Sequence, residues 1–398
     1  MNYDYIIIGA GIIGLTIAEF LSSSAKDIKV LILEKESSIG EHGSGRNSGV
    51  LHSGIYYPSE SLKAKICSIG SEKMKDFCLD NALNLKKIGK VIVPTKIDHD
   101  PILDTLMKRG MKNKSKVELV DKKTLLELEP MACSPTGRAI FSPNTSIVDP
   151  QEVLNKLKEI IISRGVKIKF NESFIDFDSK SKLIKTSKGS YSCSHLFNSS
   201  GQFSDYVANK FGIGMDYFSV PFRGIYYKLA DASNITLKRL IYPVPDINMP
   251  FLGIHSVTTI SGESYFGPSA FPAFGRENYK LTRNIDFLQT LKTLKTLFGM
   301  YISNKQNFRE YSHQEILKIQ KNHFIRSAKV LVPALDSKML HKSQKVGIRA
   351  QLFSKKSKSL VMDLVIERNE VSTHILNSVS PAFTSSFEIA RHACKDLV

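Results

Sequence analysis

Runs of apolar residues alternate with polar ones along the chain, and the first forty positions give the clearest pattern. Residues 5–8 form a continuous apolar run, as in a buried parallel strand. Residues 12–21 repeat apolar side chains at helical spacing, and residues 29–33 form a second buried-strand run that ends at Glu34. These segments predict a complete βαβ unit.

The turn between the first predicted strand and the helix is rich in glycine. Gly9 suits a tight turn, Gly11 lets a pyrophosphate approach the backbone at the positive end of the helix, and Gly14 allows close helix-to-strand packing. Glu34 stands about 20 residues further on, where an acid can bind ribose hydroxyls. A glycine-rich turn can also be purely structural, but this strand, helix and acid context favours dinucleotide binding.

A polar, glycine-rich and aromatic segment, residues 44–57, follows the second strand. An ordinary connector has little need of Arg46, Asn47 and His52 among several glycines, whereas close approach of the backbone to a planar ligand explains this composition. A second contact with the same ligand is expected at residues 198–201, where a strand runs into small residues.

The remaining pattern predicts an α/β chain with two domains. We expect a Rossmann-type dinucleotide-binding domain assembled from the discontinuous segments 1–74, 143–205 and 345–398. Residues 75–142 and 206–344 are expected to form a substrate-binding or cap domain of α+β type with a mixed sheet.

One predicted helix has a pronounced apolar stripe, formed by Leu288, Leu291, Leu294 and Phe298. Such a stripe usually faces the core, and the alternative is docking on a membrane surface. The chain has 55 Lys and Arg against 38 Asp and Glu, a net charge of +17. The densest basic cluster, residues 355–358, is typical of a solvated hairpin. No nucleic-acid-binding motif accompanies the charge, so we expect no specific nucleic-acid partner.

The cysteines indicate a reducing environment. They are widely spaced and form no C-x-x-C pair, which fits neither a disulfide framework nor a zinc site, so no metal is expected. The N-terminus has no signal-peptide pattern, and no apolar stretch is long enough to span a membrane. We expect a cytoplasmic protein, with peripheral membrane contact as an addition to that location.

Several motifs together resemble one flavoenzyme family. A single N-terminal fingerprint, an interrupted domain layout and the segments 47–57, 221–224, 240–246, 249–255 and 346–351 are similar to the L-2-hydroxyglutarate dehydrogenase/oxidase family of the glycine and D-amino-acid oxidase superfamily. The resemblance implies FAD as the cofactor. The chain departs from the family pattern at Ile225, Val257, Ser269, Gly275 and Val379, close to where the family binds its substrate.

The expected chemistry is oxidation of an alcohol. A base must accept the hydroxyl proton while hydride moves to flavin N5, and histidine suits this task. His52 is the first candidate and His255 the second; the alternative for His52 is to order the loop backbone. Arg223 and Arg349 can bind a carboxylate bidentately, although Arg349 could instead pair with a structural acid or contact the flavin. Tyr56 and Tyr227 could orient the substrate or form pocket wall.

These assignments lead to a defined hypothesis. The cofactor-binding residues we expect are Gly9, Gly11, Gly14, Glu34, Lys35, Arg46, Asn47, Ser48, Gly49, Ser200, Gly201, Ser380, Phe383 and Thr384. The resemblance implies an FAD-dependent dehydrogenase or oxidase of a small anionic 2-hydroxy acid such as L-2-hydroxyglutarate, with quinone or O2 as electron acceptor. One alternative is oxidation of an amine, amino acid or sugar-derived hydroxyl, and a second is a basic flavoprotein that binds nucleic acid or an anionic surface.

Overall fold

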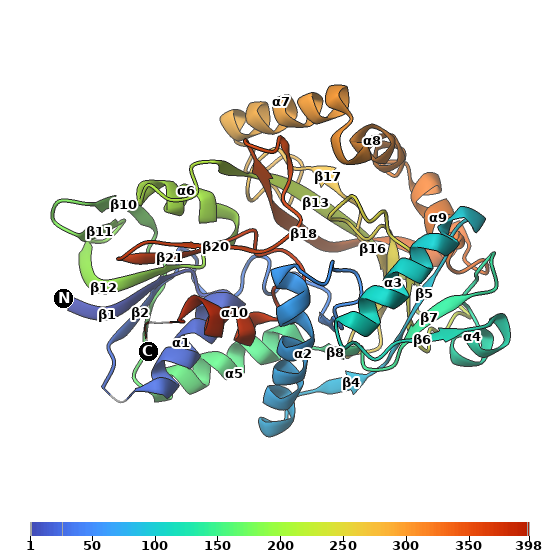
Figure 1. Cartoon of the computed structure of the whole chain (residues 1–398), viewed down its shortest axis with the longest axis horizontal. Helices are drawn as coiled ribbons and strands as arrows, with labels where there is room; N and C mark the ends of the chain where they lie inside the picture. Colours follow the sequence, from blue (N-terminus) through green and yellow to red (C-terminus); the bar gives the residue numbers. More distant parts are fainter. Residues whose placement is uncertain (1, 26, 396, 398) are drawn as a thin grey trace.

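A largely parallel sheet forms the first part of the molecule (Figure 1). The computed structural model describes residues 2–25, 27–395 and 397. The parallel strands run in the order β9–β2–β1–β12–β21, with β20 antiparallel at the edge and the β10–β11 hairpin joined to β12. Their bounds are β1 Asn2–Ile8, β2 Val30–Leu33, β9 Lys167–Lys169, β10 Phe174–Asp178, β11 Leu183–Thr186, β12 Ser190–Asn198, β20 Val365–Arg368 and β21 Ser372–Leu376.

Both faces of this sheet are covered, which explains the continuous apolar runs of the central strands, Ile6–Ile8 of β1 and Val30–Leu33 of β2. One face packs on the helices α1 (Ile12–Ser24), α2 (Leu62–Asp80), α5 (Pro150–Ser163) and α10 (Ser386–Ala393). The other face packs on β10, β11 and the short helix α6 (Ser204–Lys210). The β1–α1–β2 unit predicted from the sequence is present at the centre of the sheet.

The second part of the molecule contains three smaller sheets. The largest has the order β15–β16–β13–β18–β19, with β17 also paired to β13, and the others have the orders β14–β5–β7–β6 and β3–β8–β4. Their strands are β3 Val50–Leu51, β4 Leu85–Lys87, β5 Lys90–Val93, β6 Glu118–Val120, β7 Ala139–Ser142, β8 Ser146–Val148, β13 Tyr217–Leu229, β14 Leu240–Pro243, β15 His255–Thr258, β16 Ser264–Gly267, β17 Phe271–Pro272, β18 Leu340–Ser354 and β19 Ser359–Leu360.

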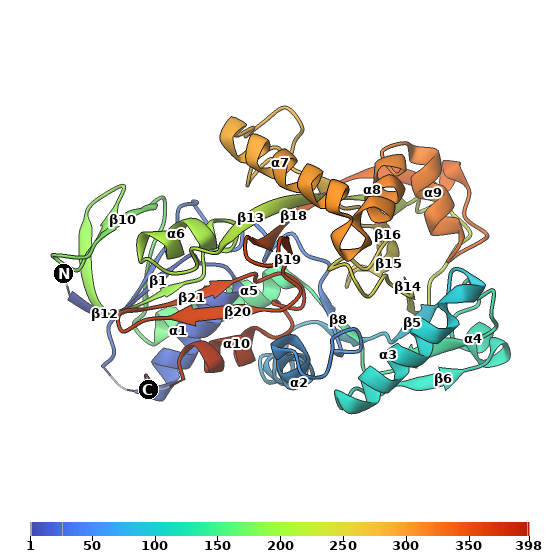
Figure 2. The ribbon, with the colours of Figure 1, turned by 45° about the horizontal axis from the view of Figure 1, so that its top comes forward.

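Helices lie on the outer side of these sheets. Figure 2 shows α7, α8 and α9 following one another over the sheet that contains β13 and β18. The helices of this part are α3 Asp100–Lys112, α4 Lys122–Leu128, α7 Phe287–Ser303, α8 Phe308–Leu317 and α9 Lys321–Lys329, with the 3-10 turns η1 Ile97–His99, η3 Lys305–Asn307 and η4 Ser337–Met339. A further 3-10 turn, η2 Gly201–Phe203, lies between β12 and α6 in the first part.

The predicted fold class is confirmed: separate chain segments assemble a dinucleotide-type α/β sheet beside a second part with mixed sheets. The expected domain boundaries at residues 74 and 345 fall inside α2 and β18. Most of β18 pairs with β13 in the second part. We therefore propose that the division follows the ends of these elements, after Asp80 and after Ser354.

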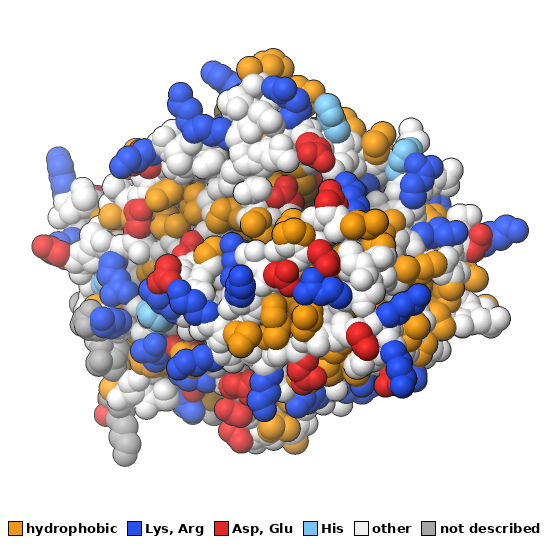
Figure 3. Space-filling view, turned by 45° about the vertical axis from the view of Figure 1, so that its right-hand side comes forward, with side chains coloured by type: hydrophobic (Ala, Val, Ile, Leu, Met, Phe, Trp, Pro, Cys, Tyr) orange, Lys and Arg blue, Asp and Glu red, His pale blue; other side chains and the backbone are white. Residues whose placement is uncertain are grey.

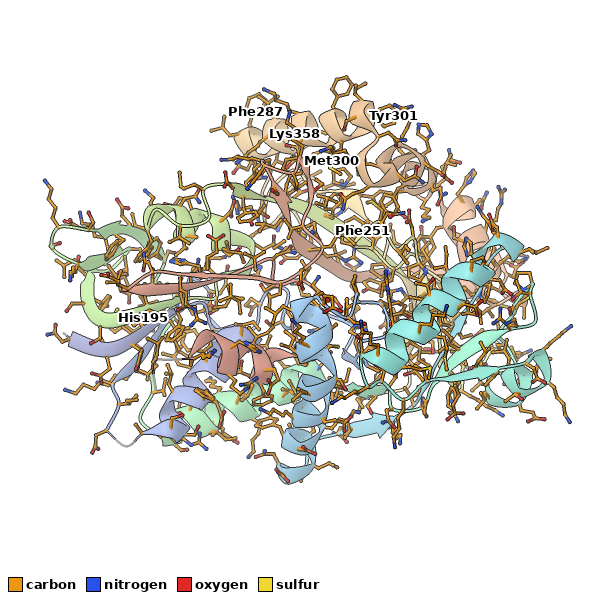
Figure 4. The ribbon with its side chains drawn as sticks, in the orientation of Figure 1. His195, Phe251, Phe287, Met300, Tyr301 and Lys358 are labelled. Atoms are coloured by element: carbon orange, nitrogen blue, oxygen red, sulfur yellow. The ribbon has the colours of Figure 1, made fainter. Side chains whose placement is uncertain are left out.

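The prediction that the apolar stripe of residues 288–298 faces the core is wrong. Leu288 is 76% exposed and Phe298 68% exposed, whereas the opposite side of α7 buries Leu297 and Met300 against Phe218 and its neighbours on the sheet. Figure 4 shows Phe287 projecting outward from α7 and Met300 lying on the inner side. An amphipathic pattern reveals two faces but not which one meets solvent. Within the described residues, no helix is long and apolar enough to cross a membrane.

Candidate active site

A cavity of about 590 Å³ is lined by both parts of the chain. It takes in the β1–α1 turn, the loop after β2, the residues after β12, the turn before α10, and residues of β13, β15 and β18. Fifteen of the residues expected in the site line it: Gly9, Gly11, Glu34, Lys35, Arg46, Asn47, Ser48, His52, Ser200, Gly201, His255, Arg349, Ser380, Phe383 and Thr384.

The β1–α1 turn is built for close contacts. Gly9 has φ +100°, and a Cβ there would lie 2.9 Å from the carbonyl oxygen of Ser199. A Cβ on Gly14 would collide with the carbonyl oxygen of Gly9, so Gly14 brings the helix against the strand without lining the cavity. Helix α1 begins after Gly11 without a side-chain cap from that residue, which leaves the positive end of the helix facing the cavity.

Glu34 closes β2 beside this turn. Its Oε2 accepts a hydrogen bond of 2.7 Å from Ala10 N, and its Oε1 accepts one of 2.9 Å from Glu36 N. Each carboxylate oxygen can accept a further hydrogen bond, so these contacts leave room for ribose hydroxyls. Lys35 is paired with Glu36 and Glu277 at the same end of the cavity.

The loop after β2 is held by its own side chains. The Arg46 guanidinium lies 4.3 Å from the centre of the Tyr279 ring, and Asn47 Oδ1 accepts a hydrogen bond of 2.8 Å from Gly49 N. Gly49 has φ +73° and packs against the backbone of Val148, so it shapes the loop without lining the cavity. The loop continues into β3, which pairs with β8 and fixes the position of the following histidine.

His52, which directly follows β3, and His255, the first residue of β15, line the same cavity. The backbone N–H of His52 donates to Thr384 Oγ1 at 3.1 Å, which ties β3 to the turn before α10. Its Nδ1 is buried without a hydrogen-bond partner. His255 Nδ1 lies 2.8 Å from the carbonyl oxygen of Gly253. Because a carbonyl only accepts, Nδ1 carries the proton and Nε2 is left as an acceptor.

Burial keeps both histidines neutral. Desolvation lowers the pKa of His52 to about 3, with a further lowering from the charges of Lys90 and His255. Desolvation also lowers the pKa of His255 to about 3; its hydrogen bond to Gly253 opposes this, and Arg349 and Lys90 add to it. A neutral imidazole near a cavity can accept a proton.

Arg349 lines the cavity and has no acidic partner among the described residues. It lies on β18, where Nη1 donates to the carbonyl oxygen of Ser269 at 3.2 Å and the guanidinium lies 5.4 Å from the centre of the Phe251 ring. The alternative that Arg349 pairs with a structural acid is therefore not seen. This position leaves the guanidinium able to bind an anion.

Three of the expected substrate residues do not line the cavity. Arg223 is half-buried on β13, outside the cavity lining. Tyr227 packs on Phe324, with ring centres 4.5 Å apart, in a separate core. Its neighbour Tyr226 lines the cavity instead, because successive side chains of a strand point to opposite faces. Tyr56 is buried next to the cavity lining.

The sequence analysis missed Tyr226, Tyr242 and Lys90. Gly224 also lines the cavity and lies two positions before Tyr226. Alternate residues of a strand share a face, so this spacing could have identified Tyr226. Tyr242 lines the cavity from β14. Lys90 begins the apolar strand β5, and a charge inside an otherwise buried run was the signal there.

The residues present fit FAD. The Gly9–Gly11 turn would hold a dinucleotide in the cavity that the two histidines also line, and the helix end and loop backbone would offer donors to its phosphates.

Comparisons with known proteins agree with this fit. A family model described as "FAD dependent oxidoreductase" matches residues 4–395. The chain is 35% identical to an L-2-hydroxyglutarate dehydrogenase of Indibacter alkaliphilus, over 99% of this chain and 98% of the relative. It is 34% identical to an L-2-hydroxyglutarate dehydrogenase of Escherichia coli K12, over 98% of this chain and 92% of the relative.

Solved structures share the fold. L-alpha-glycerophosphate oxidase from Mycoplasma pneumoniae with FAD bound superposes with a TM-score of 0.78 at 20% identity, covering 99% of this chain and 94% of that one. Glycine oxidase from Geobacillus kaustophilus gives a TM-score of 0.73 at 16% identity, covering 100% and 94%. The expected resemblance and the expected cofactor are both confirmed. The chain belongs to the FAD-dependent oxidoreductase family and, within it, to the group that contains the L-2-hydroxyglutarate dehydrogenases.

Proposed function

We propose that this protein oxidises a small 2-hydroxy acid to the 2-oxo acid, with L-2-hydroxyglutarate as the first-choice substrate and 2-oxoglutarate as the product. The observation that carries the proposal is the meeting of two neutral histidines and an unpaired arginine in the cavity that holds the dinucleotide turn. The names of the relatives support the same substrate.

The chain's own residues bind the acid and remove its hydroxyl proton. When bound, FAD supplies the acceptor for the hydride of the carbinol carbon. Arg349 binds the carboxylate next to that carbon, which brings the hydroxyl toward the histidines. His52 accepts the hydroxyl proton, and His255 Nε2, which is also an acceptor, is the alternative base. The negative charge of the substrate raises the pKa of both imidazoles and so strengthens them as bases.

FAD is held by the residues that line the nucleotide end. In this proposal Gly9 and Gly11 admit the pyrophosphate, Glu34 binds the ribose hydroxyls, and the segments around Ser48 and Ser200 contact the ring system or its linker. The turn from Ser380 to Thr384 closes the cavity from the other side.

The exposed face of α7 is the contact we propose with a membrane. Six apolar side chains of this helix are between 47% and 76% exposed: Phe287, Leu288, Leu291, Leu294, Phe298 and Ile302. Lys295 is exposed on the same helix, whereas the ammonium of Lys292 lies 4.0 Å from the centre of the Phe218 ring. Lys305 reaches the β18–β19 hairpin by donating to the carbonyl oxygen of Ser357. Figure 3 shows apolar atoms at the top of the molecule with basic side chains beside them.

An apolar stripe with lysines around it matches an anionic lipid surface. The hairpin that carries Lys355, Lys356 and Lys358 is exposed at the end of α7, as the sequence predicted. Docking there would give the protein access to a membrane quinone as electron acceptor, and O2 is the alternative acceptor. A peripheral location at the cytoplasmic face follows from this proposal.

Anaerobic reduction of the bound flavin tests the substrate class. Purified holoenzyme is mixed with L-2-hydroxyglutarate, D-2-hydroxyglutarate, glutamate, glycine and glycerol 3-phosphate in separate experiments. We expect bleaching by the L-2-hydroxy acid and formation of its 2-oxo acid. Bleaching by an amine, an amino acid or a sugar-derived alcohol in its place would redirect the assignment.

A further inference from the structure

A lysine without an acidic partner lies beside the two histidines. Lys90 begins β5, and its side chain is 0% exposed. Its Nζ has no hydrogen-bond partner in the described part of the chain. Burying an isolated ammonium away from water costs free energy. The ammonium has three N–H donors, and each needs an acceptor. The arrangement lacks an acceptor, and an anion would supply one.

Two tyrosines surround this ammonium. Lys90 Nζ lies 4.7 Å from the centre of the Tyr56 ring and 5.0 Å from the centre of the Tyr242 ring. The ring faces stabilise the cation, but they leave its N–H groups without acceptors. The hydroxyls of Tyr56 and Tyr242 are themselves buried and without hydrogen-bond partners, as is Nδ1 of His52. One ammonium, two hydroxyls and one ring nitrogen are therefore gathered without hydrogen-bond partners among the described residues.

This cluster adjoins the cavity, although Lys90 and Tyr56 are not among its lining residues. Tyr242 and His52 line the cavity, and Tyr242 stacks on His255 with ring centres 4.0 Å apart. Lys90 Nζ lies 5.0 Å from the ring centre of Tyr242, which itself stacks on His255, and the charge of Lys90 lowers the pKa of both histidines. Desolvation lowers the pKa of Lys90 itself to about 7, the direction expected for an ammonium without an acid beside it.

A second cation acts on the same histidine from another sheet. The charge of Arg349, on β18, also lowers the pKa of His255. Arg349 has no acidic partner among the described residues either. Two separate cations around one pair of bases match a substrate with two carboxylates better than one with a single carboxylate.

We propose that Lys90, together with the hydroxyls of Tyr56 and Tyr242, binds the distal carboxylate of a dicarboxylic 2-hydroxy acid. Arg349 then binds the carboxylate next to the reacting carbon. The inference rests on the proposed function and makes it more specific: Lys90 sets the preference for a dicarboxylate over a monocarboxylate of the same chain length.

Ligand binding to the oxidised holoenzyme tests this inference without turnover. The change in the visible flavin spectrum is titrated with 2-oxoglutarate and with 2-oxovalerate, which has the same carbon chain but lacks the distal carboxylate. We expect the wild type to bind 2-oxoglutarate about 100-fold more tightly, the ratio typical of a buried charged hydrogen-bonded contact. In Lys90→Met the affinities for the two ligands should differ by no more than about 3-fold. The affinity for 2-oxoglutarate should fall, and that for 2-oxovalerate should stay the same.

A matched control and the melting temperature separate this role from a structural one. Lys87→Met, on the exposed end of β4, should keep both affinities. Lys90→Met should keep FAD and hold or raise the melting temperature, because it removes an unpaired buried charge. If Lys90 has only a structural role, Lys90→Met should have a much lower melting temperature and equally reduced affinities for both ligands. That result overturns the inference.

Two further variants keep the test decisive if Lys90→Met fails to fold. Tyr242→Phe and Tyr56→Phe preserve ring packing and remove only a hydroxyl. We expect each variant to lower the affinity for 2-oxoglutarate by about 5-fold and to leave the affinity for 2-oxovalerate unchanged. Equal effects on both ligands, or a wild type that binds both alike, overturn the inference. Failure of the proposed function would be seen separately, as absence of flavin reduction by any 2-hydroxy acid.

Discussion

The rings of Tyr242 and His255 stack with centres 4.0 Å apart and planes inclined by 24°. The two residues belong to β14 and β15, which are in different sheets, and a hydrogen bond of 2.6 Å from Ile241 N to Ser256 Oγ joins the same strands. The stack holds the imidazole of His255 in one orientation at the cavity, and its Nδ1–H is used by Gly253. The imidazole is thus oriented before a substrate arrives, which favours catalysis.

His52→Ala should keep FAD and lose most substrate-dependent flavin reduction. General base catalysis contributes about 10²- to 10⁴-fold to rates of this kind, so the anaerobic reduction rate should fall by about that factor. Stopped-flow measurement of flavin bleaching gives the rate, and the visible spectrum of the purified variant reports bound FAD.

His255→Ala is the matched comparison for His52→Ala. A smaller loss is expected, because His52 takes the hydroxyl proton and His255 is the alternative base. If His52→Ala bleaches at the wild-type rate and His255→Ala does not, the roles of the two histidines are reversed.

Gly11→Val should lose FAD. A side chain at this position projects toward Ser44 Oγ, only 2.9 Å from the Cβ position, and blocks the backbone approach of the pyrophosphate. The ratio of flavin to protein absorbance measures occupancy. Gly299→Ala is the control, because no atom lies within 4 Å of its Cβ position and alanine favours the helix there. Full FAD occupancy in Gly11→Val would contradict the assignment of this turn.

Stability should fall as the pH drops below about 6.5. Burial lowers the pKa of His52, His255 and His374 to about 3 and that of His195 to about 4. The unfolded chain therefore takes up protons between pH 6.5 and 4 that the folded chain does not. Each such proton costs about 1.4 kcal/mol of unfolding free energy per pH unit.

The melting temperature of the holoenzyme, measured at intervals from about pH 7 to 5, checks this slope. His341→Asn should give the same curve as the wild type, because His341 is exposed. A melting temperature that stays level over this range would mean that the buried histidines are protonated in the folded protein.

Phe287→Ser combined with Phe298→Ser should weaken vesicle binding by about 10-fold or more, because the change removes apolar area from the stripe of α7. Co-sedimentation with vesicles containing phosphatidylglycerol is the measurement, with phosphatidylcholine vesicles for comparison. The control is Ile97→Ser, which changes an equally exposed apolar residue on η1, far along the chain from α7. Retention on RNA without vesicle binding would contradict the proposed contact.

More of the expected cofactor-binding residues than of the expected substrate-binding residues line the cavity. The β1–α1–β2 unit and its glycines are local, so spacing alone placed Gly9, Gly11 and Glu34 together. We expected Tyr227 at the cavity, but Tyr226 lines it. Which of the two faces the cavity depends on the register of β13 against β18, which is irregular between Ile225 and Tyr227.

Other features depend on tertiary contacts that no local pattern encodes. Lys90 lies next to Tyr242 because β5 pairs with β14 in a sheet formed by distant segments. The sequence pattern likewise could not show that the apolar stripe of α7 faces outward. A helix that packs on a core and a helix that lies on a membrane have the same apolar spacing.

The most direct test of the central claim is anaerobic addition of L-2-hydroxyglutarate to the yellow holoenzyme. The account predicts bleaching of the flavin with one 2-oxoglutarate formed for each FAD reduced. A flavin that stays oxidised with this acid and is bleached by an amino acid would contradict it.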